Sequence, residues 1–575
     1  MATVAQAEDA GTVRERRPSA YVSVGSISVP VRVEGVLALV AVVPLVLWTV
    51  LLLGRGWTPQ GDEALLAIRV HDVFSAHPPL TGMRSTSSST APDVWAHHPG
   101  PLQFYLLAPL YALTGWWPGA LLIGSLLLVG GFVLVAVVGA HRAGGRAGAV
   151  VVALVALATA RVGGQQLVLP LNIWPPILGL LAVLVLAWLL VLGRRRALLP
   201  YVFCASVIAQ GHIAMLPVVA VLTLVLAGVG IVRLVHTRRT RSRRLRTRRF
   251  GTGIDRDWRR SLGLAALLAV LCWLPVIVEP FVSSAPNLPE LWRLSRSDGG
   301  PGGVTVVRAL EFLLSNLVPL GPHALAGSIH EVSGVLVAAG AVVVVLAAVA
   351  FVRPTRSWMR SGLGVALTAY GTLLWATSSV RVPLQMVYSL LGMSAGLLVT
   401  GLVGCWLYDH AARRVRARVL GAPVAAVVAC LVALGFFVLV GSAFGPLTTG
   451  YGGDVARASS VVRGVQERMA EQGLLGRPTV VEFAGSQSWV SLAPAVMIDL
   501  EQEGSPVYFN VWWPRPQDDD HRRTREAPAD AVRVLVRDRI DAEPWAGDLP
   551  GATTTVPFQF EVPSGQLNVE VLIRP

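Results

Sequence analysis

The sequence contains no lysine, so all 48 of its Lys plus Arg residues are arginine. This absence is typical of a GC-rich genome, as in actinobacteria, and by itself indicates no function. Charge is scarce too, because only 14% of the 575 residues are charged while 53% are hydrophobic. A soluble core does not need so much apolar sequence, and a polytopic membrane protein is therefore predicted.

Cysteine is also scarce, and its placement argues against two kinds of site. The four cysteines lie within apolar runs and none has CxxC spacing, which argues against a disulfide framework and a zinc site. They are Cys204, Cys272, Cys405 and Cys430. Glycine-rich phosphate loops are missing as well, since no P-loop or GxGxxG turn opens a helix. Nucleotide hydrolysis is therefore not predicted.

Long apolar runs dominate the first three quarters of the chain. A helix crosses a bilayer core with about 20 apolar residues, and the sequence predicts about eleven such transmembrane helices. We expect them at 36–53, 118–139, 147–160, 173–192, 198–210, 213–232, 261–278, 331–352, 361–377, 386–407 and 419–441. The predicted transmembrane domain, residues 35–441, belongs to an α-helical protein that crosses the cell membrane many times.

Arginine clusters orient these spans. The clusters at 194–196, 233–260, 353–360 and 413–418 fall on one side of the membrane if the amino terminus is cytoplasmic. Residues 1–34 are then a disordered cytoplasmic tail, and the carboxyl-terminal region lies outside. The run 238–244 has no interleaved aromatics, so membrane lipid headgroups explain the net charge of +14 better than nucleic acid does.

Three exterior segments have their own helix and strand patterns. In the first loop, 54–117, the residue pattern predicts surface helices at 62–74 and 102–113, separated by a mobile Ser/Thr-rich passage at 81–90. In the second loop, 280–330, the pattern predicts a surface helix at 304–317 after the glycine-rich segment 298–303. Residues 442–575 predict a soluble extracytoplasmic α/β domain. Its helices are expected at 456–472 and 489–501, and its strands at 479–483, 507–511, 532–536, 558–562 and 569–573.

Two motifs in the first exterior loop carry chemistry. Gly61-Asp62-Glu63 places two adjacent carboxylates directly after the first span, and His97-His98-Pro99-Gly100-Pro101 precedes the helix expected at 102. Polar residues also gather at the expected outer ends of later spans, where a sugar site would need them. These are Arg161, Gln165, Gln166, Asn172, Gln210, His212, Arg381 and Gln385.

In these features the chain resembles the GT-C superfamily of membrane glycosyltransferases, especially the protein O-mannosyltransferase and aminoarabinose transferase branch (glycosyltransferase 39-like). Asp62-Glu63 matches the family's acidic motif after the first span, and His98-Pro99-Gly100-Pro101 loosely matches its histidine-proline element. The resemblance implies a polyprenyl-phosphate sugar as donor and an acceptor hydroxyl on an envelope glycan, lipid or protein. Sugar transfer would take place at the outer face of the cytoplasmic membrane.

The resemblance and the chemistry together suggest roles for these residues. Asp62 is the candidate base, since a positioned carboxylate accelerates proton removal by about 10²–10⁴-fold, and Glu63 is expected to orient Asp62 or the acceptor. Arginines suit the leaving phosphate through their paired donors. The candidate substrate-binding residues are His97, His98, Arg161, Gln210, His212 and Arg381, with Arg69 as a less secure cation.

Each assignment has a structural alternative. Asp62 could cap the following helix, and Glu63 could be a solvated first-turn acid that complements the helix dipole. The two loop histidines could be exposed without a role, and His212 could be an ordinary hydrogen-bonded turn residue. Arg381 could reach the membrane interface without binding phosphate.

The sequence does not support a bound metal or another cofactor. The oligosaccharyltransferase branch holds a divalent metal with a second acidic motif, but the corresponding loop here, 161–172, has no acid. A metal-independent transferase is therefore predicted, although Asp93 could supply a second carboxylate. The main competing class is a transporter or flippase of lipid-linked sugars, which usually carries ionisable residues within its spans.

Overall fold

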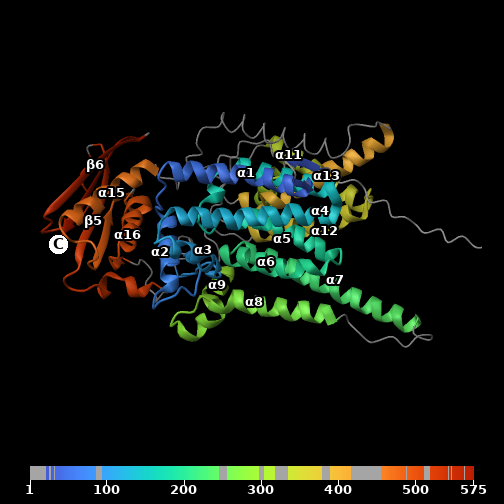
Figure 1. The fold of residues 1–575 in the computed structure, drawn as a ribbon, viewed down its shortest axis with the longest axis horizontal. Coiled ribbons are helices and arrows are strands. Elements are labelled where there is room, and N and C mark those ends of the chain that lie inside the picture. The colour runs from blue at the N-terminus through green and yellow to red at the C-terminus, as the bar shows by residue number, and fades with distance from the viewer. Residues whose placement is uncertain are drawn as a thin grey trace, which may run out of the picture.

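The computed structural model describes residues 21–575 except for 25–26, 31–32, 86–92, 245–255, 297–303, 318–333, 379–388, 416–454, 487, 511–518, 542, 546 and 563. In this part of the chain, long helices form a bundle that carries a small α/β domain at one end (Figure 1). Two short strands precede the bundle, β1 (Tyr21–Val24) and β2 (Ile27–Pro30), and pair antiparallel. The expectation of an amino-terminal tail without structure is wrong for these eight positions.

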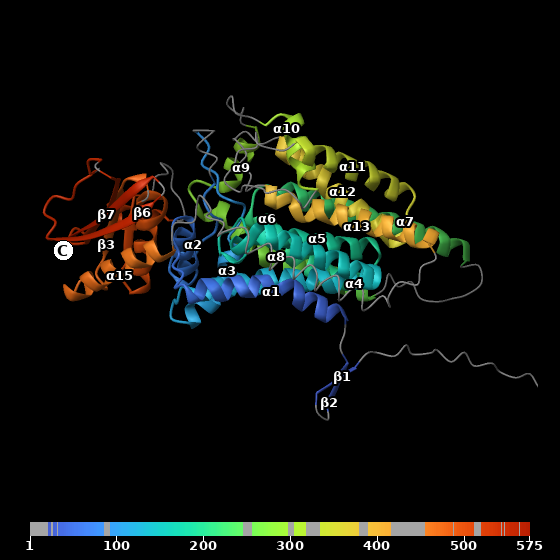
Figure 2. The ribbon, with the colours of Figure 1, turned by 90° about the horizontal axis from the view of Figure 1, so that it is seen from above.

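The bundle consists of apolar helices packed side by side (Figures 1 and 2). They are α1 (Val33–Gly54), α4 (Gly119–Gly163), α5 (Pro175–Val191), α6 (Leu198–Gly211), α7 (Met215–Arg244), α8 (Arg256–Val282), α11 (Gly334–Val352), α12 (Ser357–Ser378) and α13 (Ser389–Val415). Six helices of the described chain, α1, α4, α7, α8, α11 and α13, contain stretches long and apolar enough to cross a membrane. The protein is thus a multi-pass membrane protein.

The expected spans mostly coincide with these helices. All of them up to 386–407 overlap a described helix, and 419–441 lies outside the described residues, so the number eleven stays a prediction. Helix α4 covers two expected spans, 118–139 and 147–160. Gly145 lies between them and kinks the helix with a φ of 65°, which a side chain would disfavour. Helix α8 runs past its expected end and includes the buried Glu279, which accepts a hydrogen bond from the Asn287 backbone at 3.0 Å.

Helix α5 lies at the centre of the bundle. It is an unbroken apolar sequence in which Pro175 and Pro176 occupy the first turn, where a missing N–H costs no helical bond. Residues 175–189 are all buried, as expected for a helix that is apolar on every side. The arginine-rich turns meet at the end of the bundle far from the α/β domain, where Arg233 donates to the Leu190 carbonyl and Arg356 pairs with Asp409 at 2.7 Å.

Shorter helices lie at the end of the bundle that carries the domain. They are α2 (Asp62–His71) with the 3₁₀ turn η1 (Asp72–Phe74), α3 (Leu102–Leu113), α9 (Asn287–Arg296) and α10 (Val306–Ser315). Helix α3 has the bounds expected from sequence. Helix α2 forms as predicted but is no surface helix, because its residues 66–70 are buried. The Ser/Thr-rich passage is described only to Ser85, and 86–90 lie outside the described residues.

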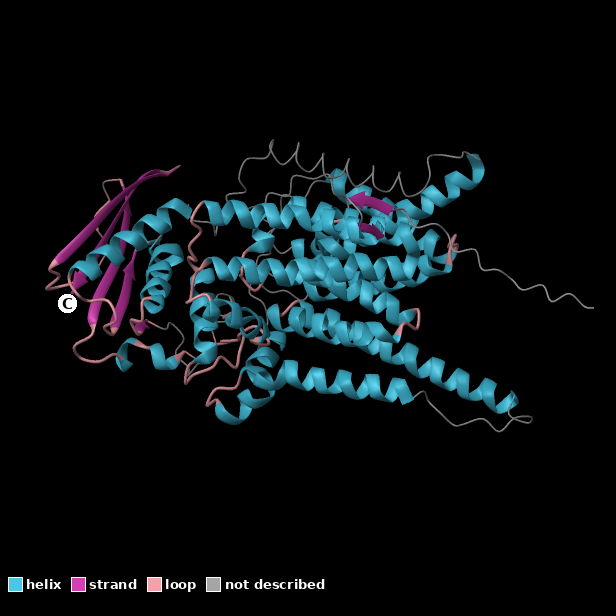
Figure 3. Ribbon diagram, viewed as in Figure 1, coloured by secondary structure: helices cyan, strands magenta, loops and turns pink. Residues whose placement is uncertain are grey.

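The carboxyl-terminal domain is a five-stranded sheet with two helices on the side of the bundle (Figures 1 and 3). Strand β3 pairs parallel with β4 and β5, while β7 pairs antiparallel with β5 and β6, which gives the order β4-β3-β5-β7-β6. Each strand expected from sequence is present. The bounds are α15 (Val455–Glu471), β3 (Thr479–Ala484), α16 (Ala493–Gln502), β4 (Val507–Phe509), β5 (Val532–Ile540), β6 (Thr554–Val562) and β7 (Gly565–Arg574).

Candidate active site

The acid pair lies in the first turn of α2, eight residues after α1 ends. Gly61, not Asp62, occupies the N-cap position, and no side chain caps this helix. Gly61 has a φ of 53°, and a Cβ there would lie 2.3 Å from the Val490 carbonyl oxygen, so only glycine fits. The interpretation of Asp62 as the N-cap residue is therefore wrong, although both carboxylates remain favourably placed at the helix N-terminus.

The two carboxyls differ in environment. The Asp62 side chain is open to solvent, yet the surrounding protein raises its pKa by burial while the positive charge of Arg84 acts to lower it. Glu63 is more enclosed: burial and the neighbouring Asp62 charge raise its pKa to about 8, against a hydrogen bond from Trp57 that lowers it. With its pKa raised to about 8, Glu63 keeps its proton near neutral pH.

Arg84 is a cation that the sequence analysis missed. It lies on a short ribbon in which residues 82–85 pair with 96–98, through bonds such as His98 N–H to the Met83 carbonyl at 2.8 Å. Its guanidinium pairs with Asp519 of the carboxyl-terminal domain, and its charge also acts on Asp62. Because the pairing joins residues on either side of a polar loop, no local sequence signal predicts it.

Both loop histidines are buried, contrary to the interpretation as exposed residues. His97 exchanges bonds with Asn287: its N–H donates to Asn287 Oδ1 at 2.8 Å, and its carbonyl accepts from Asn287 Nδ2 at 3.3 Å. His98 Nδ1 accepts from the Ile213 N–H at 3.3 Å, and burial lowers the pKa of His98 to about 4. His98 is therefore a neutral imidazole whose other nitrogen carries the proton.

The turn between α6 and α7 joins this loop to the bundle. Gln210 accepts from the Leu102 N–H with its side chain and from the Gly100 N–H with its carbonyl, both at 3.3 Å. Its amide donates to the Cys272 carbonyl at 2.8 Å. The rings of His98 and His212 lie 4.8 Å apart. The structure thus brings three of the predicted substrate-binding residues, His98, Gln210 and His212, into one network.

Asn172, another predicted polar residue, also contacts this network, because its Nδ2 donates to the Gly211 carbonyl, between Gln210 and His212, at 2.7 Å. Arg161 is half-buried near the end of α4, and Gln166 is fully buried in the following 3₁₀ turn. Arg69 is buried and donates to the Thr81 carbonyl at 3.3 Å. Asp93 is exposed. Arg381 and Gln385 lie outside the described residues.

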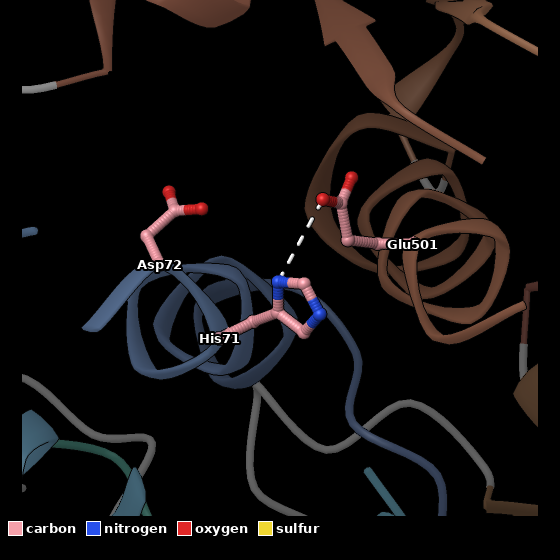
Figure 4. A group of neighbouring side chains, drawn as sticks. All are labelled: His71, Asp72 and Glu501. Carbon is pink, nitrogen blue, oxygen red and sulfur yellow. Dashed lines mark ion pairs between the residues drawn. The ribbon is translucent and has the colours of Figure 1, made fainter. Parts of the chain in front are cut away.

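Among the described residues, one group of side chains has the spacing of a metal site. Ligand atoms of His71, Asp72 and Glu501 lie within 4.8 Å of one another (Figure 4). Both carboxylates are already bonded to the guanidinium of Arg522, with Nη1 at 2.8 Å from Glu501 Oε2 and Nε at 3.1 Å from Asp72 Oδ2. A buried cation therefore satisfies the acids, and the group fits an ion-pair cluster better than a metal centre.

No protein-family model matches the sequence, and neither does any curated protein. Solved structures do match. ArnT from Cupriavidus metallidurans bound to undecaprenyl phosphate aligns over 93% of this chain and 98% of its own, with a TM-score of 0.51 and 14% identity. The apo state of the same protein gives a TM-score of 0.47 and 13% identity over the same shares. The expected GT-C-like fold is confirmed by the first of these: the chain shares the fold of ArnT, an aminoarabinose transferase of the GT-C superfamily.

Proposed function

We propose that the protein transfers a sugar from a polyprenyl-phosphate donor to an acceptor hydroxyl at the outer face of the cytoplasmic membrane, with Asp62 as the base. The observation that carries the proposal is the acid pair at the start of α2, in a chain with the fold of ArnT. That ArnT structure holds undecaprenyl phosphate, a polyprenyl phosphate, which supports a donor of this class here.

The protonation states support a division of labour in the acid pair. An acceptor hydroxyl becomes a good nucleophile only when a base removes its proton. Asp62 is open to solvent and has the positive charge of Arg84 nearby, which favours its ionised form, so it can take that proton. Glu63 keeps its own proton near neutral pH and can donate a hydrogen bond to the acceptor or to Asp62. A single displacement with one base would invert the anomeric centre.

The leaving lipid phosphate needs a positive partner. Arg84 is the best-supported candidate, since its charge reaches Asp62 and its guanidinium can bind phosphate oxygens in pairs. Arg161 and Arg381 remain candidates from the sequence. The neutral His98, with Gln210 and His212 beside it, offers hydrogen-bonding groups for sugar hydroxyls without adding charge.

Transfer by the Asp62→Asn variant tests the proposal. Membranes with wild-type protein, Asp62→Asn or the exposed control Asp530→Asn are incubated with radiolabelled polyprenyl-phosphate sugars and an envelope extract. Both label transfer and lipid-phosphate release are followed. We expect the wild type and Asp530→Asn to transfer sugar equally, and Asp62→Asn to be slower by about 10²–10⁴-fold.

Other outcomes would contradict the proposal in different ways. Transfer by Asp62→Asn at the wild-type rate would exclude Asp62 as base. No transfer from any donor, together with movement of the lipid-linked sugar across the membrane, would favour the transporter or flippase. Since we propose a metal-independent reaction, wild-type transfer should persist in excess EDTA, and its loss there would overturn that part.

A further inference from the structure

Helix α2 lies side by side with α16 of the carboxyl-terminal domain, and the two run in the same direction. Just before the two helices begin, the Gly61 N–H donates to the Ser491 carbonyl at 3.2 Å, and Ser491 Oγ donates to Gln60 Oε1 at 2.5 Å. Near their carboxyl-terminal ends, His71 Nδ1 lies 3.7 Å from Glu501 Oε1 (Figure 4). The helix that carries the acid pair is therefore in contact with the other domain at both ends.

Arg522 links α2 to α16 at the carboxyl-terminal end of α2. Its guanidinium lies between two carboxylates, bonding Asp72 through Nε and Nη2 and Glu501 through Nη1 and Nη2, at 2.5 to 3.1 Å. It also donates to the Val507 carbonyl at 3.2 Å. Arg522 is only 6% exposed and Asp72 only 2%. Such a buried, bidentate pair fixes the relative position of its two partners, and removal of one partner leaves an uncompensated buried charge.

The helix between these contacts has little stability of its own. Helix α2 has ten residues and no side-chain cap, whereas an isolated helix in water is marginal below about 12–15 residues. Its place therefore depends on its neighbours, which are α3 on the side of the bundle and α16 on the side of the domain. A shift of α2 would move Asp62 and Glu63 with it.

We propose that Arg522 is a positioning residue for the acid pair, because it clamps the end of α2 to α16 and so makes the carboxyl-terminal domain a required part of the active site. This inference rests on the proposed function. It assigns the domain a role that needs no substrate contact: the domain holds the helix from which Asp62 acts.

The variants Arg522→Met and Arg522→Lys test the inference in the full-length protein. Arg522→Met keeps the bulk of the stem and removes the charge, while Arg522→Lys keeps the charge and loses the paired geometry. Arg525→Met is the matched control, since Arg525 lies three residues further on and is 69% exposed in a pair with Glu526. Amide hydrogen exchange in residues 62–71 and the pH profile of transfer are measured for all four proteins.

We expect faster exchange across α2 in Arg522→Met and a loss in kcat of about 10²-fold, as small displacements of reacting groups can cause. Arg522→Lys should recover part of both, and Arg525→Met should match the wild type. A variant that merely lowers the amount of folded protein leaves the pH profile unchanged. Loosening of α2 instead moves Asp62, which faces Glu63 and Arg84, away from the surrounding protein. Because that surrounding protein raises the pKa of Asp62, the acidic limb of the profile moves to lower pH.

The outcomes separate this inference from the proposed function. Unchanged exchange and an unchanged pH profile in both Arg522 variants would overturn the clamp even if the wild type transfers sugar. A wild type that transfers no sugar would overturn the proposed function and the catalytic part of the inference, whatever the exchange data show. If Arg522→Met does not fold, Arg522→Lys decides, and a wild-type profile there would overturn the positioning role.

Discussion

At the scale of single residues, neighbouring carboxyls are distinguished by what surrounds them. Asp62 and Glu63 are adjacent in sequence, yet one faces solvent and the charge of Arg84 while the other is enclosed beside Trp57. The sequence predicted the pair and its place after the first span. It could not predict which carboxyl keeps its proton, because that depends on burial and on a cation 22 positions from Asp62.

The protonated state of Glu63 predicts a pH-dependent stability. Its pKa is raised from 4.5 to about 8 on folding, so the stability from this group is full below about pH 4.5 and is lost as the pH rises through about 8. Glu63→Gln has no proton to lose. Between about pH 5 and about pH 9 we therefore expect the free energy of unfolding of the wild type to fall relative to that of Glu63→Gln, by at most a few kcal/mol. The melting temperature of the wild type should fall with it.

The measurement is thermal unfolding of detergent-solubilised protein across this pH range. Glu561→Gln, an exposed glutamate on β6, serves as the control and should follow the wild type. Parallel curves for wild type and Glu63→Gln would show that Glu63 is ionised in the folded protein at neutral pH.

At the scale of elements, periodicity predicted where helices and strands lie but not what they contact. Helix α3 has the expected bounds because prolines precede an apolar run, and β6 shows the expected alternation of exposure. For the His97-His98 loop, the sequence left open an exposed loop without a role beside the predicted substrate-binding one. The loop is buried by contacts with Asn287 at the start of α9 and Gln210 near the end of α6, which lie more than 100 residues away in the sequence.

A substitution at Gly100 tests how closely the His97-His98 loop packs against Gln210. A Cβ at Gly100 would lie 2.3 Å from Gln210 Oε1 and 2.6 Å from a Val276 methyl, so Gly100→Ala must displace the Gln210 side chain. We expect a loss of about 1–3 kcal/mol in stability from this overpacking, and slower transfer as the network of His98 and His212 shifts. The assays are thermal unfolding and the sugar-transfer reaction.

Gly131→Ala is the matched control for this test. Gly131 lies within α4, and a Cβ there meets nothing within 4 Å, so alanine should leave both stability and transfer at or above wild-type values. Equal behaviour of the two alanine variants would contradict a closely fitted loop at the turn between α6 and α7.

At the scale of the whole molecule, composition predicts a membrane bundle and periodicity predicts an α/β domain, but neither predicts the interface between them. The fold of ArnT confirms the broad architecture. The joint between the two parts depends on contacts such as Asp72 with Arg522, which are 450 residues apart and carry no periodic signal. Residues so distant meet only in the tertiary structure, so sequence reasoning left the role of the domain open.

The same architecture predicts the orientation of the chain in the membrane. The arginine-rich turns lie at the end of the bundle opposite the carboxyl-terminal domain, and such turns stay on the cytoplasmic side. In intact cells we expect a membrane-impermeant maleimide to label Ser460→Cys, exposed on α15, but to label Ser357→Cys, exposed at the start of α12, only after permeabilisation.

Wild-type protein gives the baseline for this labelling, since its described cysteines are buried or partly buried within the bundle. The result bears on the chemistry as well as the topology. Asp62 lies on the same side as the domain, because Gly61 contacts Ser491 directly. Labelling of Ser357→Cys in intact cells would place the acid pair in the cytoplasm, where a transferase acting at the outer face could not use it. Labelling of Ser460→Cys alone puts Asp62 outside, at the end of the first span, where the phosphate of a membrane-embedded donor lies at the interface.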